Sequence, residues 1–144
     1  MKAYPMPMFV KLQVHDMKGA LAWYHQVLGF ASIFELPGHD GRIVMAHIRG
    51  KKYQDLMLVA AQQEEKRSEI AGSGVVMNFM VEDMDAYVER AQSAQADIVE
   101  GPVDRPWNAR ELVLQDLDGY QITLSMNIHK NMSFDEVIDQ VIDE

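Results

Sequence analysis

Polar side chains alternate with apolar ones in the last predicted strand, within residues 106–125. Gln121 and Thr123 face one side of this strand and Ile122 and Leu124 face the other, because successive strand side chains point to opposite sides of a sheet. A strand with a polar front lines a solvent-accessible cleft when another element covers its apolar back. Neutral amide and hydroxyl groups of this kind are typical of a site that binds a small molecule.

Two other side chains could transfer protons. His47 lies in a predicted strand and faces either the polar side of the sheet or a covering helix, and a role as a base would require a perturbed pKa. Glu111 opens the strand before the last turn. Asp55 lies on the same side of its strand as Met57 and Val59, so it is expected to face a helix. A register slip of one residue would turn Asp55 to the opposite face.

The composition excludes several classes of function. The 144 residues contain no cysteine, which rules out disulfides, thiolate metal sites and a cysteine nucleophile. The net charge of −9 disfavours nonspecific binding to nucleic acid or to anionic membranes. No apolar run approaches the roughly 18 residues of a membrane span, and the opening residues, MKAYPMPMF, lack the apolar core of a signal peptide. A cytoplasmic protein is therefore expected.

The elements that must position these side chains begin with a strand followed by a helix. The helix is predicted from Met17 to Leu28, with Asp16 as its N-cap and Gly29 as a left-handed C-terminal residue. Its apolar stripe can cover the back of the first strand. Strands are predicted at residues 9–14, 31–36, 42–49 and 53–60, and a polar, solvated connector follows at 61–74.

The same order then recurs. A strand is predicted at 75–81, and a helix capped by Asp83 or Asp85 ends near Ala94. Three strands follow, of which the first is a short one from Ile98 to Glu100. Val14-His15-Asp16-Met17 matches Val81-Glu82-Asp83-Met84 at three of four positions, and Tyr53-Gln54 matches Tyr120-Gln121, each pair 67 positions apart. Two matches at one offset indicate a duplicated βαβββ module.

The duplication predicts an α+β fold with one domain over residues 1–126. Module one spans about 8–60 and module two about 75–126. Residues 127–144 are predicted to contain a C-terminal amphipathic helix, which begins with a capping box of Ser133 and Glu136.

The tandem module, together with the segments AWYHQVLGF and WNARELVLQDLDGYQITL, resembles the vicinal oxygen chelate superfamily. This superfamily contains glyoxalase I, the extradiol dioxygenases, the fosfomycin-resistance enzymes and the bleomycin-binding proteins. The resemblance covers roughly Met8 to Ser125. It implies a glyoxalase-like domain in which curved mixed sheets form a groove, and it implies a homodimer.

Metal-dependent members place a His, Glu or Gln ligand at four positions on the groove side of their strands. By the resemblance, these positions are occupied here by Phe9, Leu56 (or Leu58, if a turn shifts), Val76 and Thr123. Thr is at best a weak ligand and the other side chains cannot bind a metal. The resemblance therefore implies no metal site and no cofactor.

The groove face is mostly neutral, as expected of a small-molecule cleft. Trp107 resembles the tryptophan of PW-G-R-E-F segments in bleomycin-binding relatives, where it would stack on a flat ligand or plug the end of the sheet. Asn108 replaces the usual glycine after it and tolerates positive φ. The predicted ligand-binding residues are Phe9, Lys11, Gln13, His47, Gln54, Leu56, Asn78, Met80, Trp107, Gln121 and Thr123.

The resulting hypothesis is a metal-independent binding protein of the bleomycin-resistance type, which sequesters an organic ligand or drug in its groove. An alternative is a glyoxalase-like lyase, isomerase or dioxygenase with non-standard ligands, in which His47 or Glu111 is catalytic. A third interpretation is a domain whose groove is filled by its own side chains and which acts only through protein contacts.

Overall fold

The computed structural model describes residues 3–62 and 72–143. The chain divides into two compact units, Met1–Ala71 and Gly72–Glu144, which contain module one and module two. Each module is a βαβββ unit with its own four-stranded sheet, as predicted from the duplication. Most of the predicted connector lies at residues 63–71, outside the described part of the chain.

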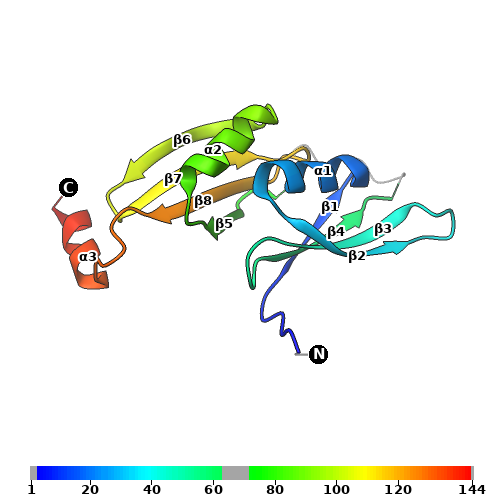
Figure 1. Cartoon of the computed structure of the whole chain (residues 1–144), viewed down its shortest axis with the longest axis horizontal. Helices are drawn as coiled ribbons and strands as arrows, with labels where there is room; N and C mark the ends of the chain where they lie inside the picture. Colours follow the sequence, from blue (N-terminus) through cyan, green and yellow to red (C-terminus); the bar gives the residue numbers. More distant parts are fainter. Residues whose placement is uncertain (1–2, 63–71, 144) are drawn as a thin grey trace. The chain divides into compact units, whose positions relative to one another are not determined.

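Module one contains a mixed sheet with the strand order β1-β4-β3-β2 and a helix that lies across one face of it (Figure 1). The pairing of β1 with β4 is parallel, and the other two pairings are antiparallel. The elements are β1 (Val10–Val14), α1 (Met17–Leu28), β2 (Ala31–Pro37), β3 (Ile43–Arg49) and β4 (Asp55–Ala60).

The ends of α1 follow from the side chains at its termini. Asp16 Oδ1 accepts a hydrogen bond from the Gly19 amide at 3.0 Å, which satisfies one free amide of the first turn. Gly29 ends the helix with φ of 71°, the left-handed conformation that glycine adopts without strain. Tyr24 and Val27 are almost fully buried, so the apolar stripe of α1 forms the core of module one with the sheet.

Module two repeats this architecture with the strand order β5-β8-β7-β6, and α2 lies across its sheet (Figure 1). Asp83, rather than Asp85, caps α2 and accepts a hydrogen bond from the Ala86 amide at 3.3 Å. The elements are β5 (Val76–Met80), α2 (Met84–Ser93), β6 (Asp97–Arg105), β7 (Ala109–Gln115) and β8 (Gln121–Asn127).

The register of β4 differs from the prediction by one residue. Leu56 pairs with Val10, whereas Ile122 pairs with Met77, so Leu56 corresponds to Ile122 rather than to Thr123. Leu56 is 1% exposed and faces α1, so its assignment to the ligand-binding face was wrong. Because side chains alternate along a strand, the same shift moves Asp55 to the opposite face.

The strand predicted at Ile98–Glu100 extends further, to Arg105. The prediction ended this strand before Gly101 and Pro102, but the strand continues through two register shifts between Ile98 and Val103. Gly101 lies at one of these irregularities with φ of 98°, and an added Cβ would collide with the carbonyl oxygen of Glu111. A side chain at this position is therefore incompatible with the pairing of β6 and β7.

The C-terminal helix α3 (Phe134–Ile142) is capped by Ser133. The Ser133 hydroxyl accepts a hydrogen bond from the Glu136 amide at 3.2 Å and donates one to the Glu136 carboxylate. The N-cap half of the predicted capping box is confirmed, and the Glu136 carboxylate bonds the Ser133 hydroxyl. None of the residues of α3 is buried. Within the described part of the chain, no helix is long and apolar enough to cross a membrane.

Candidate functional site

The predicted polar side chains of module two lie together on the sheet face turned away from α2, which we term the open face of module two. Asn78 of β5 pairs with Thr123 of β8, and paired residues of neighbouring strands share a face. Ser125 lies on the same face and donates a hydrogen bond from Oγ to Asn78 Oδ1 at 2.8 Å. Register places four of the predicted residues on this face: Asn78, Met80, Gln121 and Thr123.

Trp107, in the turn between β6 and β7, is held beside this face by a polar cluster. Glu111, paired with Ser125, accepts a hydrogen bond from Trp107 Nε1 at 3.1 Å and another from Arg105 Nε at 3.0 Å. The Arg105 guanidinium also binds both carboxylate oxygens of Glu100, at 3.0 and 2.9 Å, and lies 5.8 Å from the Trp107 ring centroid. The indole is thus fixed in position although it is 47% exposed.

The charges of this cluster compensate one another. The hydrogen bond and charge of Arg105 lower the pKa of Glu100, and the hydrogen bonds of Glu100 and Glu111 raise the pKa of Arg105. Both partners therefore stay ionised at neutral pH. Glu111 was a candidate catalytic base, but its two carboxylate oxygens accept hydrogen bonds from Arg105 and Trp107. This arrangement suits Glu111 to positioning the indole.

Asn108 shapes the turn that presents Trp107. Its φ is 61°, so the positive φ allowed for this residue from sequence is observed. The side-chain amide donates to the His129 carbonyl and accepts from the His129 amide, both at 2.8 Å. Asn108 is 6% exposed, and its backbone carbonyl accepts a further bond from Ile128. These bonds attach the turn to the segment that follows β8.

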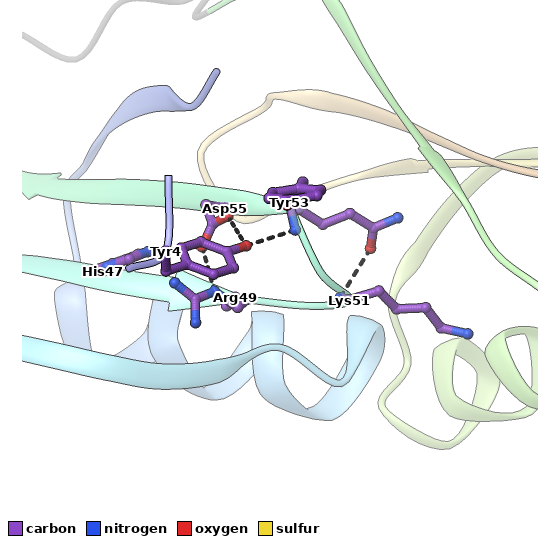
Figure 2. A network of polar contacts seen from close by, with 7 residues as sticks. Tyr4, His47, Arg49, Lys51, Tyr53 and Asp55 are labelled. Carbon is purple, nitrogen blue, oxygen red and sulfur yellow. Dashed lines mark hydrogen bonds and ion pairs between the residues drawn. The ribbon is translucent and has the colours of Figure 1, made fainter. Parts of the chain in front are cut away.

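Module one carries a buried carboxylate, Asp55, on its open face, the sheet face turned away from α1 (Figure 2). Asp55 Oδ1 accepts hydrogen bonds from His47 Nε2 at 2.8 Å and from Arg49 Nε at 2.6 Å. Asp55 was expected to face the helix, and the register of β4 overturns that expectation. The orientation of His47, which the sequence left open, is toward Asp55 and away from α1.

Tyr4 completes this network, although it is not among the residues predicted for the site from sequence. Its hydroxyl donates to Asp55 Oδ2 at 2.8 Å and accepts a hydrogen bond from the Tyr53 amide at 2.6 Å. Burial favours the neutral form of Asp55, but the hydrogen bonds from Arg49, His47 and Tyr4 outweigh it and hold the pKa of Asp55 below its ordinary value of 3.8. No pattern within residues 3–9 signals a contact with a residue 51 positions later.

The other residues predicted in module one are divided among three places. Lys11 and Gln13 are exposed on β1, and they pair with Met57 and Val59 on the open face. Phe9 directly precedes β1 and is 39% exposed. Gln54 precedes β4 in the turn after β3, where its side chain accepts a hydrogen bond from the Lys51 amide at 3.2 Å.

The corrected register also changes the comparison with metal-binding relatives. The residue of β4 that corresponds to Thr123 is Met57, so the four positions are Phe9, Met57, Val76 and Thr123. A thioether, a hydroxyl and two hydrocarbon side chains do not form a ligand set for Zn²⁺, Mn²⁺ or Fe²⁺. In residues 3–62 and 72–143, no group of three or more His, Asp or Glu side chains is arranged to hold a metal ion.

Comparison with known proteins agrees with the tandem fold. The family model described as Glyoxalase/Bleomycin resistance protein/Dioxygenase superfamily matches residues 8–124. Because this match covers more than half of the chain, the protein belongs to that superfamily. An uncharacterised protein of Mycobacterium tuberculosis is 24% identical over 131 residues, which cover 88% of this chain and 76% of that protein.

Several solved structures have the same fold. TioX from Micromonospora sp. ML1 is 26% identical with a TM-score of 0.67, covering 88% of this chain and 98% of TioX. TnmS3, an antibiotic binding protein from Streptomyces sp. CB03234, is 26% identical with a TM-score of 0.64, covering 83% and 93% of the two chains. The fosfomycin resistance protein FosX from Listeria monocytogenes is 13% identical with a TM-score of 0.63, covering 90% and 95%, a likeness of fold alone.

Proposed function

We propose that this protein binds a small, flat organic molecule without the help of a metal ion, and that Trp107 is the main contact. The observation that carries the proposal is the fixed and exposed indole of Trp107, held by Glu111 at 3.1 Å and flanked by Arg105. An aromatic ring that is held in position loses little conformational freedom when a second ring stacks on it. Flat aromatic ligands are therefore favoured.

The open face of module two supplies the polar part of this proposal. Thr123 and Asn78 offer hydroxyl and amide groups beside one another, and Met80, 49% exposed, offers an adaptable apolar surface. Hydrogen-bonding groups around an apolar contact are the usual composition of a small-molecule site. Module one has exposed side chains of its own, and there we propose Phe9, Lys11 and Gln13 as contacts for a ligand on that module. Leu56 has no part in the proposal because it is buried under α1.

The similarity to TnmS3 supports an antibiotic as the class of ligand, since that relative is an antibiotic binding protein at 26% identity. Sequestration would then be the means of protection, because the usual metal-ligand positions hold Phe9, Met57, Val76 and Thr123. We further propose that the protein is cytoplasmic and forms a homodimer, in keeping with its family.

The test is a binding screen with planar polycyclic antibiotics and 9-aminoacridine as probes, read in wild type by quenching of Trp107 fluorescence and in every protein, variants included, by isothermal titration calorimetry. We expect saturable quenching, and we expect Trp107→Ala to weaken binding at least about tenfold because a stacking contact is lost. Trp107→Phe retains a flat ring and should retain most of the affinity. Equal binding by wild type and Trp107→Ala across the panel would contradict the proposal.

Two further measurements address the metal and the assembly. Elemental analysis of protein purified without chelator should find far less than one Zn, Ni, Mn or Fe per chain, and stoichiometric metal would refute the metal-independent proposal. Sedimentation equilibrium should give twice the mass of the 144-residue chain. A monomer at all concentrations would remove the homodimer from the proposal.

One observation favours an enzymatic alternative. His47 Nε2 lies 2.8 Å from the buried Asp55 carboxylate, an arrangement that orients an imidazole for proton transfer. Turnover of a hemithioacetal or catechol substrate that is lost in His47→Ala would favour this alternative. Retention of that turnover in His47→Ala would exclude His47 as the base.

A further inference from the structure

The Tyr4 side chain occupies a site in module one that is complementary to a phenol in three respects. Its hydroxyl donates to Asp55 Oδ2 at 2.8 Å and accepts from the Tyr53 amide at 2.6 Å. Its ring lies against the Arg49 guanidinium, whose Cζ is 3.5 Å from the ring centroid, and stacks beside the Tyr53 ring at 5.5 Å (Figure 2). The site therefore provides an acceptor, a donor and two stacking partners.

Hydrogen bonds from His47 and Arg49 hold the Asp55 carboxylate independently of Tyr4. Asp55 divides its two oxygens, because Oδ1 takes the hydrogen bonds of His47 and Arg49 while Oδ2 takes that of the phenol. The Asp55 side chain is 0% exposed, whereas the Arg49 side chain retains 24% exposure. The buried Oδ2 atom of Asp55 needs a hydrogen-bond donor, and a neutral phenol is a strong donor.

The backbone of Tyr53 is held in an unusual conformation at this site. Its φ is 68°, which is uncommon for a residue with a bulky side chain, and its amide donates to the Tyr4 hydroxyl. Strained conformations of this kind persist where the surroundings impose them, and they cluster at ligand sites. Tyr53 is 46% exposed, so its side chain can stack on a ring that arrives from solvent.

The segment that delivers Tyr4 is suited to leaving. Residues 3–9 form no helix or strand, and Pro5 and Pro7 have no amide hydrogen with which to join a sheet. Pro5, Pro7 and Met8 are exposed, with Met8 at 75%. The segment is thus anchored chiefly through the Tyr4 side chain, and displacement of that side chain breaks few other contacts.

We infer that the site formed by Arg49, Tyr53 and Asp55 is a second ligand site, specific for phenols, and that Tyr4 is its internal competitor. The inference goes beyond the proposed function, because every residue involved belongs to module one and Trp107 plays no part. An exogenous phenol displaces the Tyr4 ring, takes its two hydrogen bonds and releases the N-terminal segment. A ring without a hydroxyl leaves the Asp55 oxygen and the Tyr53 amide unpaired, so it binds poorly.

The test uses 4-methylphenol, which reproduces the Tyr4 side chain beyond Cα, and follows by NMR the Tyr53 amide of Tyr4→Ala and the Tyr4 amide of wild type. Tyr4→Ala should bind it saturably and at least about tenfold more tightly than wild type, since wild type must first release its own ring. Wild type at high 4-methylphenol should approach the spectrum of the occupied variant. Toluene should bind neither protein.

Two variants separate a phenol site from a general cavity. Asp55→Asn in the Tyr4→Ala background should weaken 4-methylphenol binding about tenfold or more, because a charge-assisted hydrogen bond is lost. Tyr87→Ala is the matched control, since Tyr87 also lies near an arginine, with the Arg90 Cζ 5.7 Å from its centroid, but outside this site. It should leave binding unchanged. If Tyr4→Ala does not fold, Tyr4→Phe takes its place. This variant keeps the competing ring but lacks the hydroxyl, so it should bind 4-methylphenol more tightly than wild type does.

Free phenols and tyrosine side chains of other chains share this chemistry, and N-acetyltyrosinamide distinguishes them. Tighter binding of 4-methylphenol assigns the site to free phenols, and tighter binding of N-acetyltyrosinamide assigns it to tyrosine-bearing segments. The inference is overturned if Tyr4→Ala binds neither probe, if Asp55→Asn has no effect, or if saturating probe leaves the wild-type Tyr4 amide unshifted. Any of these results leaves the Trp107 proposal intact, because its variants and probes are different.

Discussion

The hydroxyl of Tyr4 lies 2.8 Å from Oδ2 of Asp55 and joins the N-terminal segment to a strand 51 positions later. This contact exists because β4 turns Asp55 to the open face, where its carboxylate is buried and already bonded to His47 and Arg49. Tyr4 supplies the donor for the remaining oxygen. A side chain from outside the regular elements of module one is thereby bonded to its sheet.

Replacing Tyr4 with Phe should lower the free energy of unfolding, because the Asp55 oxygen loses its donor while the ring contact with Arg49 remains. We expect a smaller loss than for Asp55→Asn, measured by urea denaturation. Tyr87→Phe, which removes a hydroxyl in module two, should leave the midpoint unchanged. A midpoint for Tyr4→Phe equal to that of wild type would mean that the contact contributes nothing.

Asp55→Asn should destabilise the protein by about 1–3 kcal/mol at neutral pH, because the buried carboxylate is replaced by a group that bonds Arg49 and His47 less strongly. The pKa of Asp55 is lowered in the folded protein, so the ionised form contributes stability above its ordinary pKa of 3.8. That contribution disappears as pH falls through the folded pKa. Urea denaturation from pH 3 to 7 should show the difference between wild type and variant shrinking below about pH 4.

Glu111→Ala should loosen Trp107, since it removes the acceptor of the indole hydrogen bond at 3.1 Å. Acrylamide quenching should increase, with the signal coming mainly from Trp107 because Trp23 is only 7% exposed. Glu100→Ala is the control, as it removes a partner of Arg105 but none of the indole. If the two variants quench alike, the Glu111 bond does not fix the ring.

Asn108→Ala should cost about 1–3 kcal/mol, because two hydrogen bonds to the His129 backbone are lost and alanine is strained at φ of 61°. Asn108→Gly loses the same bonds without the strain and should be about 1 kcal/mol more stable than Asn108→Ala. Thermal unfolding of both variants measures the difference. Equal stability would indicate that the turn relaxes to another backbone conformation.

Much of the fold was readable because it is encoded locally. Asp16 and Gly29 define the ends of α1 through contacts within one helical turn, and Ser133 and Glu136 do the same at the start of α3. The alternation of β8 was equally readable, since Gln121 and Thr123 need only the two-residue period of a strand to share a face. Duplication of these patterns was sufficient to predict two βαβββ modules.

The errors arose where a local pattern had two interpretations. The strand after α2 was predicted to end at Glu100, but β6 continues through Gly101 and Pro102 because irregular pairing with β7 accommodates both residues. Tyr53-Gln54 was aligned with Tyr120-Gln121, yet the sheet pairs Asp55 rather than Gln54 with Arg49. Nothing within four or five residues of sequence distinguishes the two registers of β4.

By itself the sequence determined the order of elements, the caps of the helices and the polar front of β8, because each depends on neighbours along the chain. Only the tertiary structure decided that Leu56 faces α1 and that Asp55 faces Tyr4, since both follow from the pairing of β4 with β1 and β3. It likewise brought Glu111 to the indole of Trp107. Strand register depends on the packing of an entire sheet face, and a shift of one residue reverses every side chain of a strand.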